Sequence, residues 1–370
     1  MKVMTIFGTR PEAIKMCPLI KTLKKTKDVQ CIVCLTGQHK EMLDSVMKTF
    51  DVTADYNLQI MKSYQTLSEI TCRVLSGLDK ILEKEVPDIV LVHGDTTTSF
   101  AAALACFYKG IPLGHVEAGL RTYDMTSPFP EEFNRQAVDL VSKFYFAPTT
   151  MAEQNLLSEG KPAEQIFVTG NTVIDALQTT VQDNYICSDL EWCSDSRLLL
   201  VTAHRRENLG TPMEEMFKAI RTIVEQYPDV KVIYPVHKNE RVRVVANEIL
   251  GDMERIRLIE PLDVIDFHNY MKRAHIILTD SGGVQEEAPA LGIPVLVMRD
   301  TTERAEGIEA GTLKLVGTSF ESIYRETCKL LDCDDTYRRM SVAVNPYGDG
   351  HASERITEIL LKAILNNKQG

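Results

Sequence analysis

The chain has 370 residues, with 41 lysines and arginines against 52 aspartates and glutamates, so its formal net charge is −11. Its hydrophobic fraction of 44% and charged fraction of 25% are ordinary for a globular protein and exclude disordered and fibrous classes. The acidic balance argues against a general nucleic-acid or membrane-surface binder, because phosphate backbones and anionic lipids repel it. The length predicts two domains.

Short apolar strands alternate with longer helical patterns along the chain. We predict strands over residues 3–7, 30–35, 89–93, 113–116, 144–147, 198–202, 230–235, 257–259, 276–279, 295–297 and 313–316. We predict helices over residues 12–26, 67–85, 213–227, 319–332 and 352–366. This alternation indicates βαβ units with parallel strands, and continuous apolar strands are typical of sheets that helices cover on both faces.

The polar, irregular stretch 182–196 separates two such series, and we place the domain boundary there. No apolar run reaches the roughly 18 residues that a membrane helix needs, and residues 3–7 are too short for a signal peptide. Cys31 and Cys34 form the one Cys-x-x-Cys, but residues three apart in a strand point to opposite faces. We therefore expect reduced thiols and a cytoplasmic protein.

Open parallel sheets bind ligands at the carboxyl ends of their strands, so the chemistry is sought there. After the first strand, Gly8 leads into a helix that carries Arg10 and Lys15 near its start. Two cations beside free helix amides suit an anion, although a capped turn with exposed cations would look the same. Asp95 follows the third predicted strand as a helix cap or an active-site acid.

Further acids follow the next strand of the first half. Glu117 comes directly after the predicted strand 113–116, and a proline-rich loop then leads to Glu131. Several carboxylates around one strand-end region are hard to explain as solvated surface. They are candidates for acid–base chemistry.

In the second half, His204 ends a strand and Arg205 follows it, giving a group that titrates near neutral pH beside a donor for phosphate or carboxylate. Ser281, Gly282 and Gly283 open a helix in which Glu287 lies one turn further on. Paired glycines at a helix start let backbone amides reach a pyrophosphate. The acid can accept from ribose hydroxyls, by analogy with dinucleotide folds.

Several motifs are absent from the sequence. No Gly-x-Gly-x-x-Gly follows a strand, which argues against tightly bound NAD. No cluster has metal-ligand spacing; His115 and Glu117 could touch a metal, but alternate residues that share a strand face explain them equally well. We therefore expect neither a cofactor nor a metal.

Taken together, these residues resemble the bacterial non-hydrolysing UDP-N-acetylglucosamine 2-epimerases, essentially from end to end. The motifs that carry the resemblance are FGTRPEA (7–13), HGDT (93–96), HVEAGLR (115–121), PFPEE (128–132), AHRREN (203–208), DSGGVQEEAP (280–289) and RDTTER (299–304). So many separate motifs in one order make the match highly specific.

The resemblance implies an α/β GT-B fold, with two Rossmann-like parallel-sheet domains facing each other across a cleft. It places a sugar and carboxylate domain at 1–170, a UDP-binding domain at 171–350, and a C-terminal helix, 351–370, that returns to the first domain. It implies a homodimer whose substrates are UDP-N-acetylglucosamine and UDP-N-acetylmannosamine, feeding surface polysaccharide synthesis. The family's site residues fall on Arg10, Lys15, Asp95, Glu117, Glu131, His204, Phe267, Ser281, Gly282, Gly283, Glu287 and Arg304.

Some bacterial members also bind a second UDP-N-acetylglucosamine as an activator. The corresponding contacts are Gln38, Glu131, Arg205 and His237. This chain has Tyr64 where such members often carry an arginine, which is a departure at the activator site and not at the catalytic one.

The bonding around C2 of the sugar limits the possible routes of the implied reaction to two. The hydrogen on C2 of the sugar is not next to a carbonyl, so inversion needs either oxidation at C3 by a nicotinamide or expulsion of UDP to give a glycal. The missing dinucleotide fingerprint favours expulsion. Asp95 and Glu117 are then the leading proton-transfer candidates and Glu131 the third. The alternatives are a GT-B glycosyltransferase, a hydrolysing epimerase and a catalytically silent nucleotide-sugar sensor.

Overall fold

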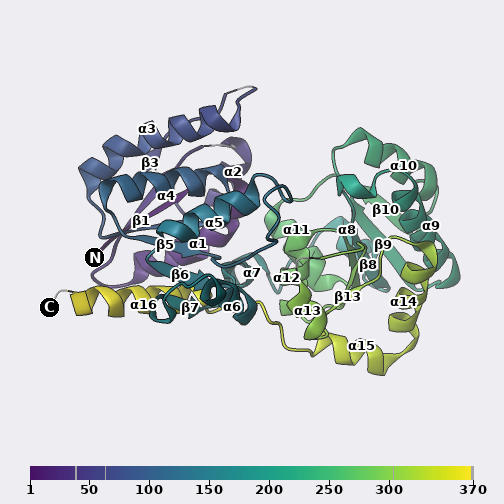
Figure 1. Ribbon diagram of the computed structural model, residues 1–370. Coiled ribbons are helices and arrows are strands. Elements are labelled where there is room, and N and C mark those ends of the chain that lie inside the picture. Colours follow the sequence, from purple (N-terminus) through teal and green to yellow (C-terminus); the bar gives the residue numbers. More distant parts are fainter. Residues whose placement is uncertain (38–39, 63, 303, 368–370) are drawn as a thin grey trace. The chain divides into compact units, whose positions relative to one another are not determined.

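The computed structural model describes residues 1–37, 40–62, 64–302 and 304–367 (Figure 1). The chain divides into two compact units. The first contains Met1–Thr179 and the segment from Tyr347 onward, and the second contains Thr180–Pro346. The division at residue 180 comes just before the irregular stretch 182–196.

The first unit is built on a seven-stranded parallel sheet with the order β3-β2-β1-β4-β5-β6-β7. Its strands are β1 (Lys2–Phe7), β2 (Gln30–Leu35), β3 (Tyr56–Asn57), β4 (Ile89–His93), β5 (Leu113–Val116), β6 (Phe144–Ala147) and β7 (Ile166–Val168). The chain winds outward from β1 in one direction and then from β4 in the other. The carboxyl ends of β1 and β4 therefore mark the switch point at which such sheets bind ligands.

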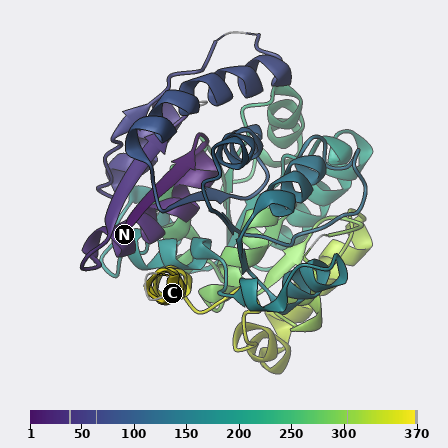
Figure 2. The ribbon, with the colours of Figure 1, turned by 60° about the vertical axis from the view of Figure 1, so that its left-hand side comes forward.

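Helices cover both faces of this sheet (Figures 1 and 2). They are α1 (Arg10–Lys25), α2 (Lys40–Thr49), α3 (Leu67–Glu85), α4 (Thr97–Lys109), α5 (Glu131–Val141), α6 (Thr150–Ser158), α7 (Thr172–Thr180) and α16 (Ala352–Asn367), with a short 3₁₀ turn at Ala163–Gln165. The last helix, α16, packs against α1, and Asp175 accepts hydrogen bonds from the backbone nitrogens of Ala352 and Ser353 at its start.

The second unit has a six-stranded parallel sheet with the order β10-β9-β8-β11-β12-β13. Its strands are β8 (Arg197–Thr202), β9 (Val230–Pro235), β10 (Ile256–Ile259), β11 (Ile276–Thr279), β12 (Val295–Val297) and β13 (Leu313–Leu315). Its helices are α8 (Ser188–Trp192), α9 (Thr211–Gln226), α10 (Glu240–Leu250), α11 (Val264–Arg273), α12 (Gly282–Ala290), α13 (Ala305–Glu309), α14 (Phe320–Asp332) and α15 (Asp334–Ser341), with a 3₁₀ turn at Arg206–Asn208. Here the switch point lies between β8 and β11.

The predicted α/β class with parallel sheets is confirmed. Each predicted strand is present to within one residue at either end, because continuous apolar runs are buried by helices on both faces. The strands β3 and β7 were not predicted. They have two and three residues and lie at the two edges of their sheet, where a short segment has too little apolar sequence to be recognised.

The hydrophobic core of each unit fills the layers between sheet and helices. In the first unit Ile6 and Phe7 of β1 are fully buried, and in the second Phe217 of α9 packs with Tyr234 of β9. Burying one such side chain stabilises the fold by about 1.5–3 kcal/mol. Among the described residues, no helix is long and apolar enough to cross a membrane.

Candidate functional site

The turn after β1 is fixed by Glu12, a buried acid that joins two strand ends. Its Oε2 accepts hydrogen bonds from the backbone nitrogens of Gly8 and Thr9, at 3.0 and 2.8 Å. Its Oε1 accepts from the hydroxyl of Thr96, at 2.7 Å, in the turn after β4. One side chain thus holds both loops of the switch point. Burial raises the pKa of Glu12, although these hydrogen bonds oppose the rise.

Gly8 is required where β1 approaches its neighbours. A Cβ atom added at Gly8 would lie 1.9 Å from Oγ1 of Thr36 and 2.8 Å from Oγ1 of Thr98. A side chain at Gly8 would collide with both threonines, so only a glycine lets the turn that leads into α1 come this close to them. Arg10 is the first residue of α1, where helix amides and a cation both favour an anion.

Glu117 follows β5 and is the centre of a buried polar cluster. Its backbone φ is +69°, a left-handed conformation that costs a non-glycine residue about 1–3 kcal/mol and that often accompanies function. Its Oε1 forms an ion pair with Nζ of Lys15 and accepts a hydrogen bond from Nδ2 of Asn171 at 2.9 Å. Its Oε2 lies 3.8 Å from Nε2 of His93.

These contacts determine which groups in the cluster are charged. Burial acts to raise the pKa of Glu117, but Lys15 and the hydrogen bonds outweigh it, so the pKa lies well below the ordinary value. Burial lowers the pKa of His93 to about 3, which leaves this imidazole neutral at physiological pH. The cluster therefore contains a carboxylate, an ammonium and a neutral imidazole.

Asp95 and Glu131 lie near α5 in different settings. The carboxylate of Asp95 forms an ion pair with Arg135, and its backbone oxygen accepts from Asn134 at 2.9 Å. Glu131 begins α5, and its Oε2 is buried with no hydrogen-bond partner among the described residues. A buried carboxylate oxygen without a partner is costly, so a ligand that donates to it would relieve that cost.

A second buried network connects the loops that follow β4 and β5. Nε2 of His115 lies 2.8 Å from the backbone oxygen of Gly94, and its Nδ1 lies 2.6 Å from Asp139. Asp139 also pairs with Arg121 at 2.7 Å. Both ring nitrogens of His115 therefore face oxygen acceptors. The sequence pattern left a metal role open for His115, but its two nitrogens are engaged by the protein.

In the second unit, Asp280 has the same linking role as Glu12. Its Oδ2 accepts from the backbone nitrogens of His204 and Arg205, both at 2.9 Å, and from Nδ2 of Asn208 at 3.1 Å. Burial acts to raise the pKa of Asp280, but the His204 side chain and these hydrogen bonds lower it overall. The carboxylate orients His204, whose Nδ1 lies 3.2 Å from Oδ1.

The start of α12 forms a cationic turn. Ser281 precedes the helix, and the guanidinium of Arg304 lies so close that a Cβ added at Gly282 would approach its Cζ to 3.1 Å. Glu286 holds Arg304 in this position, at 2.8 Å from Nη2. A side chain at Gly282 would press on the guanidinium, which would have to shift by a few tenths of an ångström. Helix amides and a fixed guanidinium together suit a phosphate group.

Glu287 lies on α12 beside a buried histidine of α11. Nε2 of His268 is 3.5 Å from Oε2 of Glu287, and its Nδ1 is 2.6 Å from Oγ1 of Thr180. Phe267, the preceding residue, packs on the core cluster beneath the sheet. A Cβ atom added at Gly283 would lie 3.5 Å from Oε1 of Glu287, which is an ordinary contact distance.

The residues expected at an activator site are only partly placed. Gln38 lies outside the described residues. The rings of His237 and His204 stack with centroids 5.6 Å apart, and burial together with the neighbouring His204 lowers the pKa of His237. Tyr64 is fully exposed. Within the described ranges no cluster of His, Cys, Asp or Glu could hold a metal ion.

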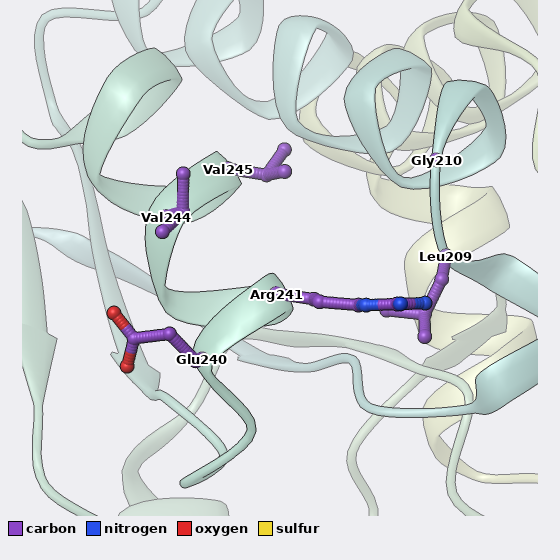
Figure 3. Close-up of a pocket in the computed structure, with 6 residues that line it drawn as sticks. All are labelled: Leu209, Gly210, Glu240, Arg241, Val244 and Val245. Atoms are coloured by element: carbon purple, nitrogen blue, oxygen red, sulfur yellow. The ribbon is translucent and has the colours of Figure 1, made fainter.

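One pocket in each unit lies beside loops that follow the strands. One, of about 470 Å³, is lined by Leu209, Gly210 and the first turns of α10 (Figure 3). Figure 3 shows Arg241 reaching across toward Leu209 while Glu240 points away. The other, of about 420 Å³, is lined mainly by aromatic and small side chains of α3, α4 and the segment 129–134. Neither is lined by the predicted acids or cations.

Sequence reasoning missed three residues that complete the acid cluster: His93, Arg135 and Asn171. The position of His93 at the end of a predicted strand could be read from the sequence. Its burial and its lack of charge could not. Asn171 follows β7, the short edge strand that the sequence did not reveal. Arg135 lies on α5, one turn after Glu131 and in no recognised motif.

Comparison with known proteins gives consistent matches. A family model described as UDP-N-acetylglucosamine 2-epimerase matches residues 21–361. The UDP-N-acetylglucosamine 2-epimerase of Bacillus subtilis is 59% identical over 361 residues, covering 98% of this chain and 95% of its own.

Solved structures agree with this match. The UDP-GlcNAc 2-epimerase of Neisseria meningitidis, solved with UDP-GlcNAc, is similar with a TM-score of 0.89 and 48% identity, covering 98% of this chain and 100% of its own. An S. aureus protein solved with UDP is similar with a TM-score of 0.90 and 53% identity, covering 99% of this chain and 97% of its own. The predicted GT-B type of fold is thereby confirmed.

The Lys15–Glu117 pair predicts a pH-dependent stability. In Lys15→Met, burial is opposed only by Asn171 and His93, so the pKa of Glu117 rises from its lowered value. We expect a loss of about 3–5 kcal/mol at pH 7, where a buried charge is left without its partner. The loss should shrink as the pH falls through 5 and 4, because Glu117 becomes neutral in the folded variant, while the wild type begins to lose stability as its unfolded chain takes up a proton that its folded, ionised Glu117 does not.

Denaturant unfolding at several pH values measures this gap. Lys25→Met on the exposed side of the same helix is the matched control and should show little effect at any pH. A gap for Lys15→Met that stays constant from pH 4 to 7 would show that Lys15 does not set the charge of Glu117.

Proposed function

The chain belongs to the UDP-N-acetylglucosamine 2-epimerase family, and we propose that it inverts C2 of UDP-N-acetylglucosamine by eliminating UDP and adding it back. The epimerase activity itself, that of an isomerase acting on this nucleotide sugar, follows from the family. The proposal concerns the route. The intermediate is 2-acetamidoglucal, and the product is UDP-N-acetylmannosamine.

The electron balance of the route defines what the site must supply. The C2–H bond breaks and its electron pair forms the C1=C2 double bond, while the C1–O bond breaks and its pair leaves on UDP. The proton goes to a base. In the reverse step UDP adds to C1 and an acid protonates C2 on the other face. No external oxidant is needed.

The departing diphosphate needs fixed positive groups, and the second unit contains them. Arg304 is held by Glu286 beside the start of α12, where Ser281, Gly282 and Gly283 present backbone amides. His204 is oriented by Asp280. Preorganised donors of this kind stabilise charge that develops in the transition state. We propose that this unit binds UDP, with Phe267 and Glu287 on the nucleoside side.

Proton transfer needs positioned acids, and the first unit contains three. Glu117 is the observation that carries the proposal: its Oε1 is occupied by Lys15 and Asn171, whereas its Oε2 accepts no hydrogen bond from the described residues. Because its pKa is low, it is ionised at neutral pH and can stabilise positive charge at C1 or accept a proton, although the same contacts that lower its pKa also weaken it as a base. Asp95 and Glu131 are the other candidates, and Arg10 and Lys15 supply positive charge near them.

Three further expectations stay predictions. A second UDP-N-acetylglucosamine at Gln38, Glu131, Arg205 and His237 is one, and the departure at Tyr64 weighs against it. The use of the product in surface polysaccharide synthesis is another. The cytoplasmic location expected from the cysteines is the third, and the nine cysteines are free.

Two other activities would use the same groups. A GT-B glycosyltransferase would form product only with an acceptor. A hydrolysing epimerase would release free N-acetylmannosamine and UDP. The match to 2-epimerases over the length of the chain favours the non-hydrolysing isomerase over the transferase.

The route is tested by incubating the pure protein with UDP-N-acetylglucosamine in heavy water, without NAD or acceptor, and following C2 by NMR. We expect UDP-N-acetylmannosamine with deuterium at C2 and no accumulation of free sugar. Glu117→Gln and Asp95→Asn should each lower turnover by about 10²–10⁴-fold. Inversion with the original hydrogen retained would contradict elimination, and free N-acetylmannosamine would indicate the hydrolysing enzyme.

We also propose a homodimer that uses the outer face of α4 and α5. Phe107 and Tyr108 at the end of α4 are 62% and 69% exposed, and Leu140 at the end of α5 is 76% exposed. The two helices pack against each other, the ring centroids of Phe107 and Tyr108 lie 6.3 Å apart, and water disfavours exposed apolar side chains that gather in one area. A second copy of the chain is its proposed occupant.

Sedimentation or light scattering tests the homodimer. The wild type should have twice the mass of one chain, and Leu140→Arg should shift it to the monomer because a charge is buried at the contact. Val342→Arg, at a similarly exposed apolar residue of the second unit (72% exposed), is the control and should remain dimeric. A dimer that survives Leu140→Arg unchanged would place the interface elsewhere.

A further inference from the structure

His93 is a buried histidine whose Nε2 has no hydrogen-bond partner among the described residues. The side chain is 5% exposed, at the carboxyl end of β4 and one residue before Gly94. A buried ring nitrogen without a partner costs free energy, and proteins rarely leave one in place. Nε2 is therefore open to a hydrogen bond that this arrangement of the described residues does not make.

The geometry indicates what that partner is. Nε2 of His93 points at Oε2 of Glu117, 3.8 Å away, which is beyond hydrogen-bond distance. The other oxygen, Oε1, is already bound by Lys15 and Asn171. Gly94 has no side chain to crowd Oε2, since a Cβ there would lie 3.1 Å from that oxygen. The two unoccupied atoms, one nitrogen and one oxygen, face each other.

The charge states explain why they do not bond at rest. His93 is neutral, so one of its ring nitrogens carries a lone pair and no proton. Glu117 is ionised, so Oε2 carries no proton either. The separation of 3.8 Å is the one expected when the ring proton is on Nδ1, because an Nε2–H would donate to the carboxylate, whereas a lone pair on Nε2 gains nothing by closer approach. If Oε2 carries a proton, the same pair of atoms can form an O–H···N hydrogen bond.

We propose that His93 is a positioning residue for proton transfer: its Nε2 accepts a hydrogen bond from Glu117 Oε2 when that oxygen carries the proton taken from C2. The proton stays on Oε2, and no second proton moves, so the electron balance of the elimination is unchanged. His93 then stabilises the protonated acid that the reaction forms, and directs its hydrogen. This inference rests on the proposed elimination and names what supports its base.

The other groups around the ring are consistent with this role. Burial disfavours a positive charge on His93 most strongly; Glu117 favours one but does not outweigh burial, and Lys15 of α1 and His115 of β5 disfavour it further. An imidazole held neutral in this way cannot itself remain protonated during turnover. It can accept a hydrogen bond, which is the one contribution that Lys15 and Asn171, both donors, do not make.

The test replaces His93 with phenylalanine, which keeps the ring and removes the nitrogens. We expect kcat for UDP-N-acetylglucosamine to fall about 10- to 100-fold with KM unchanged, because the lost hydrogen bond exists only after proton transfer begins. The isotope effect on kcat with C2-deuterated substrate should rise, since proton transfer becomes slower. His275→Phe is the matched control, because burial also keeps that histidine neutral, with a pKa of about 4.

The outcomes separate the inference from the function on which it rests. If the wild type inverts C2 with exchange and His93→Phe has the same kcat and isotope effect, the inference is wrong and the elimination stands. A fall in kcat matched by His275→Phe, or accompanied by an equal rise in KM, would also overturn it. If the wild type shows no exchange at C2, the proposed elimination fails first.

A second measurement does not depend on the folding of His93→Phe. In protein labelled with ¹⁵N-histidine, Glu117→Gln places a neutral amide opposite Nε2, which can donate as the protonated acid would. We expect the Nε2 resonance of His93 to shift between the wild type and Glu117→Gln, while that of His275 stays unchanged. An unshifted His93 resonance would contradict the proposed hydrogen bond.

Discussion

The ion pair between Lys15 and Glu117 is the interaction on which the rest of the acid cluster depends. Burial alone would make Glu117 neutral, and a neutral acid could not accept the proton of C2. Lys15, from the first turns of α1, reverses that tendency, and Asn171 adds a hydrogen bond to the same oxygen. The contacts of Oε1 thereby offset the free-energy cost of burying the charge, and Oε2 remains available to accept a proton.

The two units fix the loops at their switch points in the same way. In each, a buried carboxylate joins the loops at the switch point of a parallel sheet: Glu12 links the turns after β1 and β4, and Asp280 links those after β8 and β11. Neither acid is a candidate for proton transfer. Both accept backbone hydrogen bonds that would otherwise be unsatisfied, and so they fix the loops that carry the functional side chains.

The local apolar pattern was sufficient to predict most of the fold. Strands such as 89–93 and 276–279 are continuous hydrophobic runs, and their ends located Asp95, Glu117 and the turn before α12. What the sequence could not provide is tertiary: Asn171 reaches Glu117 from 54 residues away along the chain, and Arg135 reaches Asp95 from 40 residues away. The neutrality of His93 likewise depends on burial, which no local pattern encodes.

The charge of Glu117 is therefore the quantity to measure. Carbon-13 NMR of protein labelled at the glutamate carboxyl carbons, with the Glu117 resonance assigned by its loss in Glu117→Gln, follows its ionisation directly. We predict that this carboxyl remains ionised as the pH is lowered through 4.5, the ordinary value, and that it becomes protonated at higher pH in Lys15→Met. A Glu117 resonance that titrates at or above 4.5 in the wild type would contradict the account.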